Sequence, residues 1–177
     1  YGVALEWTIF DGLRMFANHE QLKETQKLGE AELRQAILGK VGEVMTTYYD
    51  LVQQQQQLSA LDSTLLISEQ RVELAQNRFT IGKASKLEVL NAQVDLNTDI
   101  TEIQRQQELL KNTKILLNEQ LARDLKIDFK VIPEIFVDKD LNLEELESKV
   151  VAENPQLQAE KINRRISELE LKQIKAS

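Results

Sequence analysis

The sequence has no cysteine, only two prolines and only six glycines among its 177 residues. Without cysteine, a disulfide framework and a thiolate metal site are both excluded. Aromatic residues, at 5%, are few for a compact globular core, whereas 42% hydrophobic and 29% charged residues are typical of a helix-rich, rod-like chain. The composition therefore favours long helices over a globular domain.

The chain is acidic, with a net charge of −7 and a pI near 4.9. Nucleic acid is disfavoured as a partner, because phosphate binding needs clustered Lys and Arg. The apolar runs, such as residues 65–67 and 115–117, are far shorter than the roughly 20 residues that a membrane-spanning helix needs. Any membrane contact would therefore have to use a strand.

Catalytic chemistry finds little support in the sequence. His19 is the only histidine, and the sequence contains no phosphate-binding glycine-rich loop and no metal-ligand spacing. Glutamates at 144, 145 and 147, and again at 168 and 170, are typical of exposed helical faces. We therefore predict that the protein is not an enzyme and has no catalytic residues, no metal and no cofactor.

The first ten residues alternate large apolar side chains with small or polar ones, which is typical of a strand with one apolar face. About 9–11 residues suffice for a barrel strand to cross a membrane, although one strand needs neighbours to pair its backbone groups. A half-buried strand in a soluble sheet is the alternative. The positions that would face lipid are Tyr1, Val3, Leu5, Trp7 and Ile9.

No proline occurs before Pro133, and the apolar residues keep helical spacing over a long distance. One position of a seven-residue repeat stays apolar, which predicts a long helix with a packing seam. A second stripe, first through Val41 and Tyr48 and later through Leu61 and Ala75, indicates that this seam drifts around the helix. The residues of the apolar repeat are Ile37, Val44, Leu51, Leu58, Leu65, Val72 and Phe79.

A tight turn and a second helix follow. Gly82 can adopt the positive φ of such a turn, and Ser85 with Glu88 has the spacing of a capping box. Because the link is short and the second helix has the same period, we predict two antiparallel helices packed side by side. The second apolar repeat consists of Val89, Leu96, Ile103, Leu110 and Leu117.

Beyond residue 125, alternating apolar and charged residues and then Pro133 predict an extended segment. Asn142 is a candidate N-cap for a helix over 143–153, and Asn154 followed by Pro155 predicts the start of another helix. The chain begins inside one pattern and ends inside another, so we expect a piece of a longer protein. Part of the apolar surface of its seams would then be exposed to water. We therefore expect the fragment to self-associate in isolation.

Three landmarks occur in order along the chain. The first is the stretch Trp7-Thr8-Ile9-Phe10-Asp11-Gly12, and the third is Asn154-Pro155 with Leu157. The second lies around the turn and comprises Arg78, Phe79, Gly82, Ser85, Leu87, Glu88, Val89, Leu90, Ala92 and Leu96. These landmarks resemble, respectively, the end of the second barrel strand, the hairpin tip and the start of the next long helix in TolC-family outer-membrane efflux proteins.

The sequence departs from the family pattern at three positions. Thr8 stands where the family often has Pro, Leu13 stands where a second Gly is common, and Glu88 replaces the more usual Asp. Gly12 can still turn the chain and Glu88 can still cap a helix. The departures leave open the subfamily and therefore the cargo.

The resemblance implies a mainly α fold, in which a long antiparallel coiled-coil hairpin follows a short β-barrel strand and precedes a small mixed equatorial segment. It implies an outer-membrane barrel strand over 1–11 and a periplasmic hairpin over 12–124. Within the hairpin, the helices would cover about 12–80 and 85–124, with the tip at 81–84. The equatorial segment would cover 125–153, and the helix that starts the second repeat would cover 154–177.

The resemblance also implies a function: the exit duct of a tripartite efflux or type I secretion system in a Gram-negative outer membrane. The duct would be a homotrimer in contact with outer-membrane lipid and, through a periplasmic adaptor protein, with an inner-membrane pump. By analogy, the adaptor would contact Arg78, Gly82, Ser85 and Leu87. Three of these also have a local explanation, because Gly82 suits the turn, Ser85 can cap, and Arg78 lies at a helix C-terminus.

Two other classes of protein remain open on the sequence. A periplasmic adaptor also carries a helical hairpin, but lipoyl-like β segments would be expected beside it. A structural coiled-coil scaffold would explain the heptads but neither the strand around Trp7 nor the helix restart at Asn154-Pro155. An enzyme is a distant third.

Overall fold

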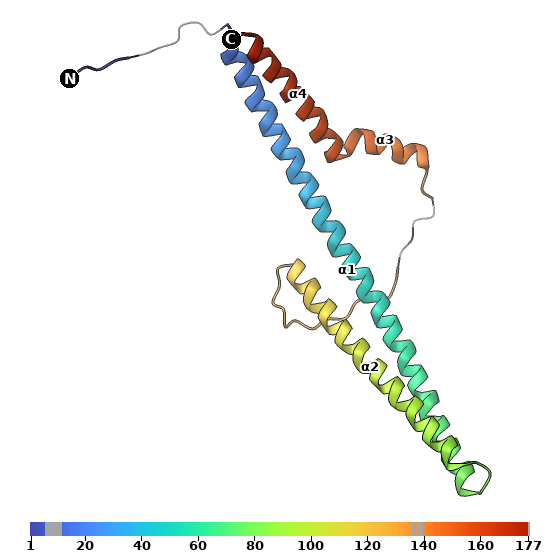
Figure 1. Cartoon of the computed structure of the whole chain (residues 1–177). Coiled ribbons are helices and arrows are strands. Elements are labelled where there is room, and N and C mark those ends of the chain that lie inside the picture. The colour runs from blue at the N-terminus through green and yellow to red at the C-terminus, as the bar shows by residue number, and fades with distance from the viewer. Residues whose placement is uncertain (6–11, 136, 138–139, 177) are drawn as a thin grey trace. The chain divides into compact units, whose positions relative to one another are not determined.

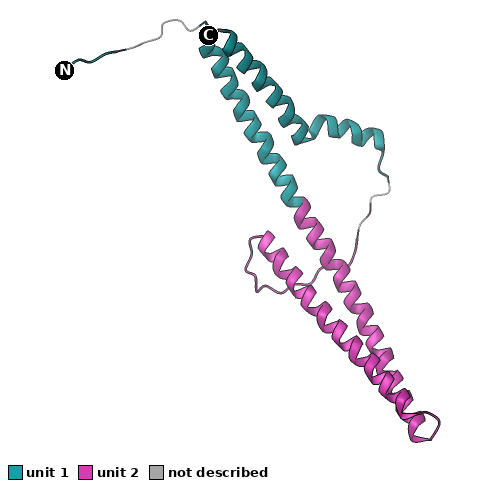
Figure 2. Ribbon diagram, viewed as in Figure 1, with its two compact units in different colours: residues 1–41, 138–177 teal, residues 42–137 magenta. Residues whose placement is uncertain are grey.

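The computed structural model describes residues 1–5, 12–135, 137 and 140–176. These residues are mainly helical, as predicted. The helices are α1 (Arg14–Thr80), α2 (Lys86–Gln120), α3 (Leu143–Glu153) and α4 (Pro155–Ala176) (Figure 1). By contact the chain divides into two units, one of residues 42–137 and the other of residues 1–41 and 138–177 (Figure 2).

The strand expected over residues 1–11 is not confirmed. Residues 1–5 have no regular secondary structure, and Tyr1, Val3 and Leu5 are fully exposed. The other two predicted lipid-facing residues, Trp7 and Ile9, lie outside the described residues. Because a strand is defined by hydrogen bonds to neighbouring strands, its presence over 1–11 stays a prediction.

In the unit of residues 42–137, α2 runs back alongside the second part of α1 (Figure 1). The predicted apolar repeat forms the seam between them: its members from Val44 to Val72 in α1, and all those in α2, are buried or half-buried. Phe79, at the end of the α1 repeat, is 40% exposed, and Ile37, in the other unit, is 53% exposed. The antiparallel pair is therefore held by the predicted stripe over most of its length.

A second stripe lies beside the apolar one, and it includes Leu61 and Ala75, two of the residues that we assigned to such a stripe. In both helices its members recur every seven residues, three positions after the apolar ones, and most are polar. All ten are buried or half-buried, whereas Val41, which we assigned to the seam, is about half exposed. The stripe comprises Thr47, Gln54, Leu61, Ser68 and Ala75 in α1, and Ala92, Asp99, Gln106, Thr113 and Gln120 in α2.

Polar members of this stripe make hydrogen bonds across the seam. The Ser68 hydroxyl donates to the Asp99 carboxylate, and Gln106 Nε2 donates to the backbone oxygen of Gln54 at 3.1 Å. Polar groups in a packed seam are stable only when they are hydrogen-bonded, so such contacts favour one register of the two helices. Of the four residues that we assigned to a second stripe, Tyr48, Leu61 and Ala75 are buried or half-buried, but the prediction missed the polar members because it followed only apolar side chains.

The far end of α2 is closed by a fully buried asparagine. Asn118 Nδ2 donates to the backbone oxygen of Ile127 at 2.8 Å, and its Oδ1 accepts from Arg123 Nη2 at 2.8 Å. The Arg123 guanidinium lies 5.0 Å from the ring centre of Phe129, in a cation–π contact. The segment that follows α2 is thereby folded back, and Val131 joins a buried cluster with Leu51, Val52 and Leu117.

The helix α2 ends at Gln120, four residues before the end that we expected. Ala122 adopts a φ of +52°, and the backbone N–H of Arg123 donates to the oxygen of Asn118 at 2.9 Å. This bond and the one from the Ala122 N–H to the Glu119 oxygen form a Schellman-type helix end. Such helix ends usually have glycine at the left-handed position, where this chain has Ala122. The sequence therefore contains no sign that the helix ends here.

In the other unit, α4 runs antiparallel to the first part of α1 (Figure 1). Ala31 of α1 and both Ala159 and Leu169 of α4 are buried. At the start of α4, Asn154 Oδ1 accepts from the N–H groups of Gln156 and Leu157 at 2.9 and 3.2 Å, which confirms the predicted cap. The predicted cap of α3 is confirmed as well, because the Asn142 side chain accepts from the Glu144 N–H.

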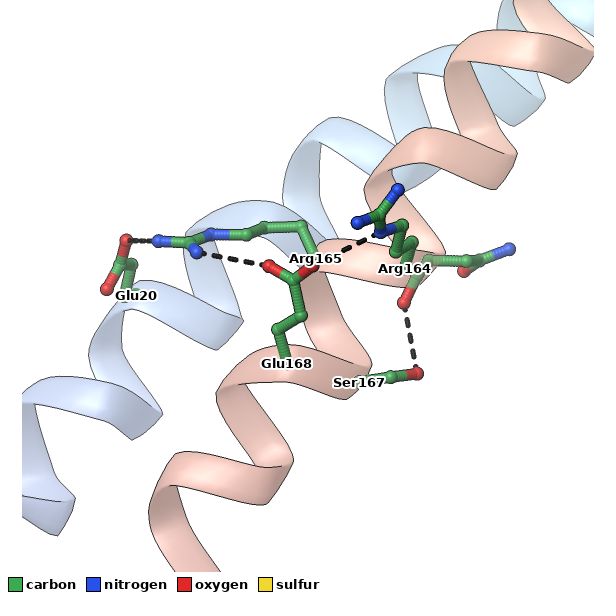
Figure 3. Close-up of polar contacts among 6 residues, drawn as sticks. Glu20, Arg164, Arg165, Ser167 and Glu168 are labelled. Atoms are coloured by element: carbon green, nitrogen blue, oxygen red, sulfur yellow. Dashed lines mark hydrogen bonds and ion pairs between the residues drawn. The ribbon is translucent and has the colours of Figure 1, made fainter.

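Charged groups link the same two helices. Arg165 Nη2 of α4 lies 2.7 Å from Glu20 Oε1 of α1, and Arg165 Nη1 lies 3.4 Å from Glu168 Oε2 (Figure 3). The hydrogen bond from Arg165 lowers the pKa of Glu20 from its usual 4.5, and the one to Glu20 raises the pKa of Arg165. The charged form of Glu20 is therefore favoured in the folded state.

We predict that Asn118→Ala destabilises the protein by about 2–4 kcal/mol, because it removes two short hydrogen bonds and empties the space of a fully buried side chain. Thermal and denaturant unfolding of the purified protein measure the loss. The matched control is Asn112→Ala on an exposed face of α2, which we expect to be neutral or slightly stabilising. Equal stability of the two variants would contradict the role of Asn118.

A second prediction concerns pH. Because the folded-state pKa of Glu20 is depressed, its contribution to stability is present above the unfolded value of 4.5 and is lost as the pH falls through the folded pKa. Glu20→Gln should therefore lower the unfolding temperature at about pH 6 and make little difference at about pH 3. The control is Glu160→Gln, at an exposed position of α4. If Glu20→Gln lowered the unfolding temperature by the same amount at both pH values, the prediction would be refuted.

Candidate functional site: the hairpin tip

The turn between α1 and α2 is built by the end of α1. Gly82 has a φ of +74°, a conformation that residues with a Cβ rarely adopt. The N–H of Gly82 donates to the Phe79 oxygen at 2.9 Å, and the N–H of Lys83 donates to the Arg78 oxygen at 2.7 Å. These two bonds define a Schellman motif with glycine at its left-handed position. The predicted role of Gly82 in the turn is confirmed.

The start of α2 is fixed by side chains. Ser85 is the N-cap, and its hydroxyl oxygen accepts from the Glu88 N–H at 3.2 Å. The Glu88 carboxylate accepts from Arg78 Nη1 of α1 at 3.0 Å, so it ties the two helices together across the turn. Both side chains are nearly half exposed, and an exposed ion pair contributes at most about 1 kcal/mol. This link was not predicted, because the capping-box pattern assigned Glu88 to its own helix.

The structure separates the four predicted contact residues into two kinds. Arg78 and Ser85 are engaged within the hairpin, by the ion pair and the cap respectively. Leu87 is 65% exposed, and a Cβ added at Gly82 would meet nothing within 4 Å. Leu87 and the space beside Gly82 are therefore the part of the predicted set that is open to a partner.

Three further exposed side chains lie at the tip and were not in the predicted contact set. Ile81, inside the turn, is 65% exposed, and Phe79 and Leu90 are also exposed. We had placed Phe79 in the seam by its spacing. A large apolar residue inside a four-residue turn is the sequence signal that identifies Ile81. We refer to Phe79, Ile81, Leu87 and Leu90 as the apolar tip group.

The chemistry of the tip is suited to binding. Within the described residues, no group of three or more His, Cys, Asp or Glu is placed to hold a metal ion. No helix in the described part of the chain combines the length and apolar character needed to cross a membrane. The tip offers apolar side chains, a glycine that leaves room for a partner, and one exposed ion pair.

One comparison with known proteins gives a match. The family described as outer membrane efflux protein matches residues 1–122, a span that includes both arms of the hairpin and the tip. No curated protein and no solved structure gives a significant match. Because the family match covers more than half of the chain, this chain belongs to the outer membrane efflux protein family. This family is one of outer-membrane channel and transport proteins.

We predict that Gly82→Ala destabilises the hairpin by about 1 kcal/mol, because alanine is strained at positive φ. The matched control is Gly39→Ala inside α1, where a Cβ meets nothing within 4 Å and the gain in helix propensity should stabilise by up to about 1 kcal/mol. Unfolding temperatures of the two variants should move in opposite directions. A shift of both in the same direction would contradict this account of the turn.

Proposed function

We propose that this chain forms part of a trimeric duct that crosses the periplasm, and that its hairpin tip docks on a periplasmic adaptor protein. The observation that carries the proposal is the apolar tip group. Ile81 and Leu87 are each 65% exposed at the end of a hairpin whose seam already buries its apolar repeat. Exposed apolar side chains that cluster in one place are typical of protein contacts.

Membership of the efflux family supports the rest of the proposed duct. The hairpin supplies wall segments of the periplasmic tunnel, and residues 1–11 supply a barrel strand in contact with outer-membrane lipid. The adaptor links the tip to an inner-membrane pump. In this arrangement Gly82 leaves room for a close approach of the adaptor, while Arg78 and Ser85 shape the turn that presents Ile81 and Leu87.

The two alternative functions, a periplasmic adaptor and a structural scaffold, have less support than the duct. A periplasmic adaptor also carries a helical hairpin, but the family match is to the outer membrane efflux proteins. A structural scaffold requires no exposed apolar residues at a glycine turn. The scaffold alternative predicts that the tip can be made polar without loss of transport.

The proposal is tested with a photo-activatable residue at position 81 or 87 in the full-length protein in its host. We expect an adduct with the periplasmic adaptor from both positions, and none from position 108, an exposed site on α2 away from the tip. Adducts are identified by mass spectrometry. Adaptor adducts of equal yield from all three positions, or from none, would contradict tip docking.

A matched pair of substitutions separates docking from folding. We expect Ile81→Asp to abolish the adaptor adduct from position 87, because a carboxylate is poorly tolerated in an apolar contact. The conservative variant Ile81→Val should retain it. Since Ile81 is mostly exposed, both variants should keep the unfolding free energy within about 0.5 kcal/mol of the wild type. A loss of the adduct in both variants, or in neither, would argue against the contact.

A further inference from the structure

The helix α3 has an apolar stripe that nothing in the structure covers. Leu143, Leu146 and Val150 have the spacing that places side chains on one helical face, and none of the residues of α3 is buried. By helical position, Glu147 and Glu153 border this stripe on its two sides. The helix thus presents an apolar strip between two carboxylates.

The carboxylates of α3 outnumber its lysine. Lys149 Nζ lies 2.7 Å from Glu145 Oε1, and Lys149 is three residues from Leu146, so this ion pair lies beside the apolar stripe. With four glutamates and one lysine, α3 carries a net negative charge.

A groove at the end of α2 has the opposite character. It has a volume of about 380 Å³, and it is lined by three apolar and three basic side chains together with Asp128. Lys114 lies 2.6 Å from Asp128, which lowers the pKa of that carboxyl group and keeps it charged. The three apolar residues are Ile115, Leu125 and Ile127, and the three lysines are Lys111, Lys114 and Lys126.

The groove is therefore a basic site on an acidic protein. Lys114 is paired with Asp128, and Lys111 Nζ lies 3.9 Å from Glu108 Oε2, so three lysines stand against two carboxylates. The site keeps a net positive charge, although the whole chain carries a net charge of −7. Leu125 and Ile127 are 50% and 43% exposed, so the apolar part of the groove is open. An apolar strip bordered by carboxylates matches this surface in both polarity and charge.

We propose that α3 of a second copy of this chain docks in the lysine-lined groove. Its apolar stripe covers Leu125 and Ile127, and its carboxylates lie near Lys111 and Lys126. A contact in which two different surfaces of one chain meet is heterologous, and repeated around an axis it closes a ring. The inference deepens the trimeric duct proposed above and rests on it, because it names the surfaces through which neighbouring copies meet.

Disulfide trapping tests the contact directly, because the chain has no cysteine of its own. Two differently tagged full-length chains are co-expressed, one with Leu146→Cys and the other with Ile127→Cys. We expect a disulfide-linked heterodimer under oxidising conditions. The matched control replaces Leu146→Cys by Ser148→Cys, which places the thiol on the opposite face of α3 and should give several-fold less product.

Charge reversal adds an independent test. The double variant Lys111→Glu and Lys126→Glu, made in the chain that carries Ile127→Cys, should lower the yield of heterodimer several-fold. An unchanged yield would mean that the lysines do not attract α3. A cross-link that forms only within a chain carrying both cysteines would overturn the intermolecular contact.

The oligomeric mass of the same samples distinguishes the inference from the proposed function. A trimer that forms without the Leu146–Ile127 cross-link overturns the docking of α3 and leaves the duct intact. A monomer overturns both. A trimer that is linked through these positions and not through residue 148 supports both.

Discussion

The left-handed turn at Gly82 is the constraint on which the hairpin depends. A Schellman motif ends α1, and three residues later the hydroxyl of Ser85 caps α2, so the two helices must lie antiparallel. Side chains at similar distances from the turn then face one another. The Arg78–Glu88 ion pair near the tip and the Ser68–Asp99 hydrogen bond further along show this register. The same turn leaves Ile81 and Leu87 exposed at the end of the hairpin.

The seam combines two stripes with different physical roles. The apolar stripe removes Leu51, Ile103 and Leu117 from water, which supplies the driving force for packing. The polar stripe contributes little to that force, but hydrogen bonds such as that from Ser68 to Asp99 are satisfied only in one register. At the far end, Asn118 fixes the returning segment by its contact with Ile127. The hairpin is thus held by different interactions at its turn, along its seam and at its base.

The sequence was informative wherever the signal was local or periodic. The apolar repeat, the caps at Asn142 and Asn154, and the positive φ of Gly82 follow from spacing and from the stereochemistry of single residues. The polar stripe could not be recognised, because hydropathy does not mark Gln or Ser as seam residues. Likewise, the partners of Asn118 and Glu20 come from other segments, and no local rule connects them. Of the tip, the sequence identified Leu87 but overlooked Ile81.

Function follows from the combination of this hairpin with membership of the outer membrane efflux protein family. A duct wall needs long helices in a fixed register, and a docking tip needs exposed apolar residues that are not required for folding. The most direct measurement is the oligomeric mass and single-channel conductance of the full-length protein purified from the outer membrane and reconstituted in a planar bilayer. We predict a trimer that inserts and conducts ions; a monomer that inserts without conducting would contradict the account.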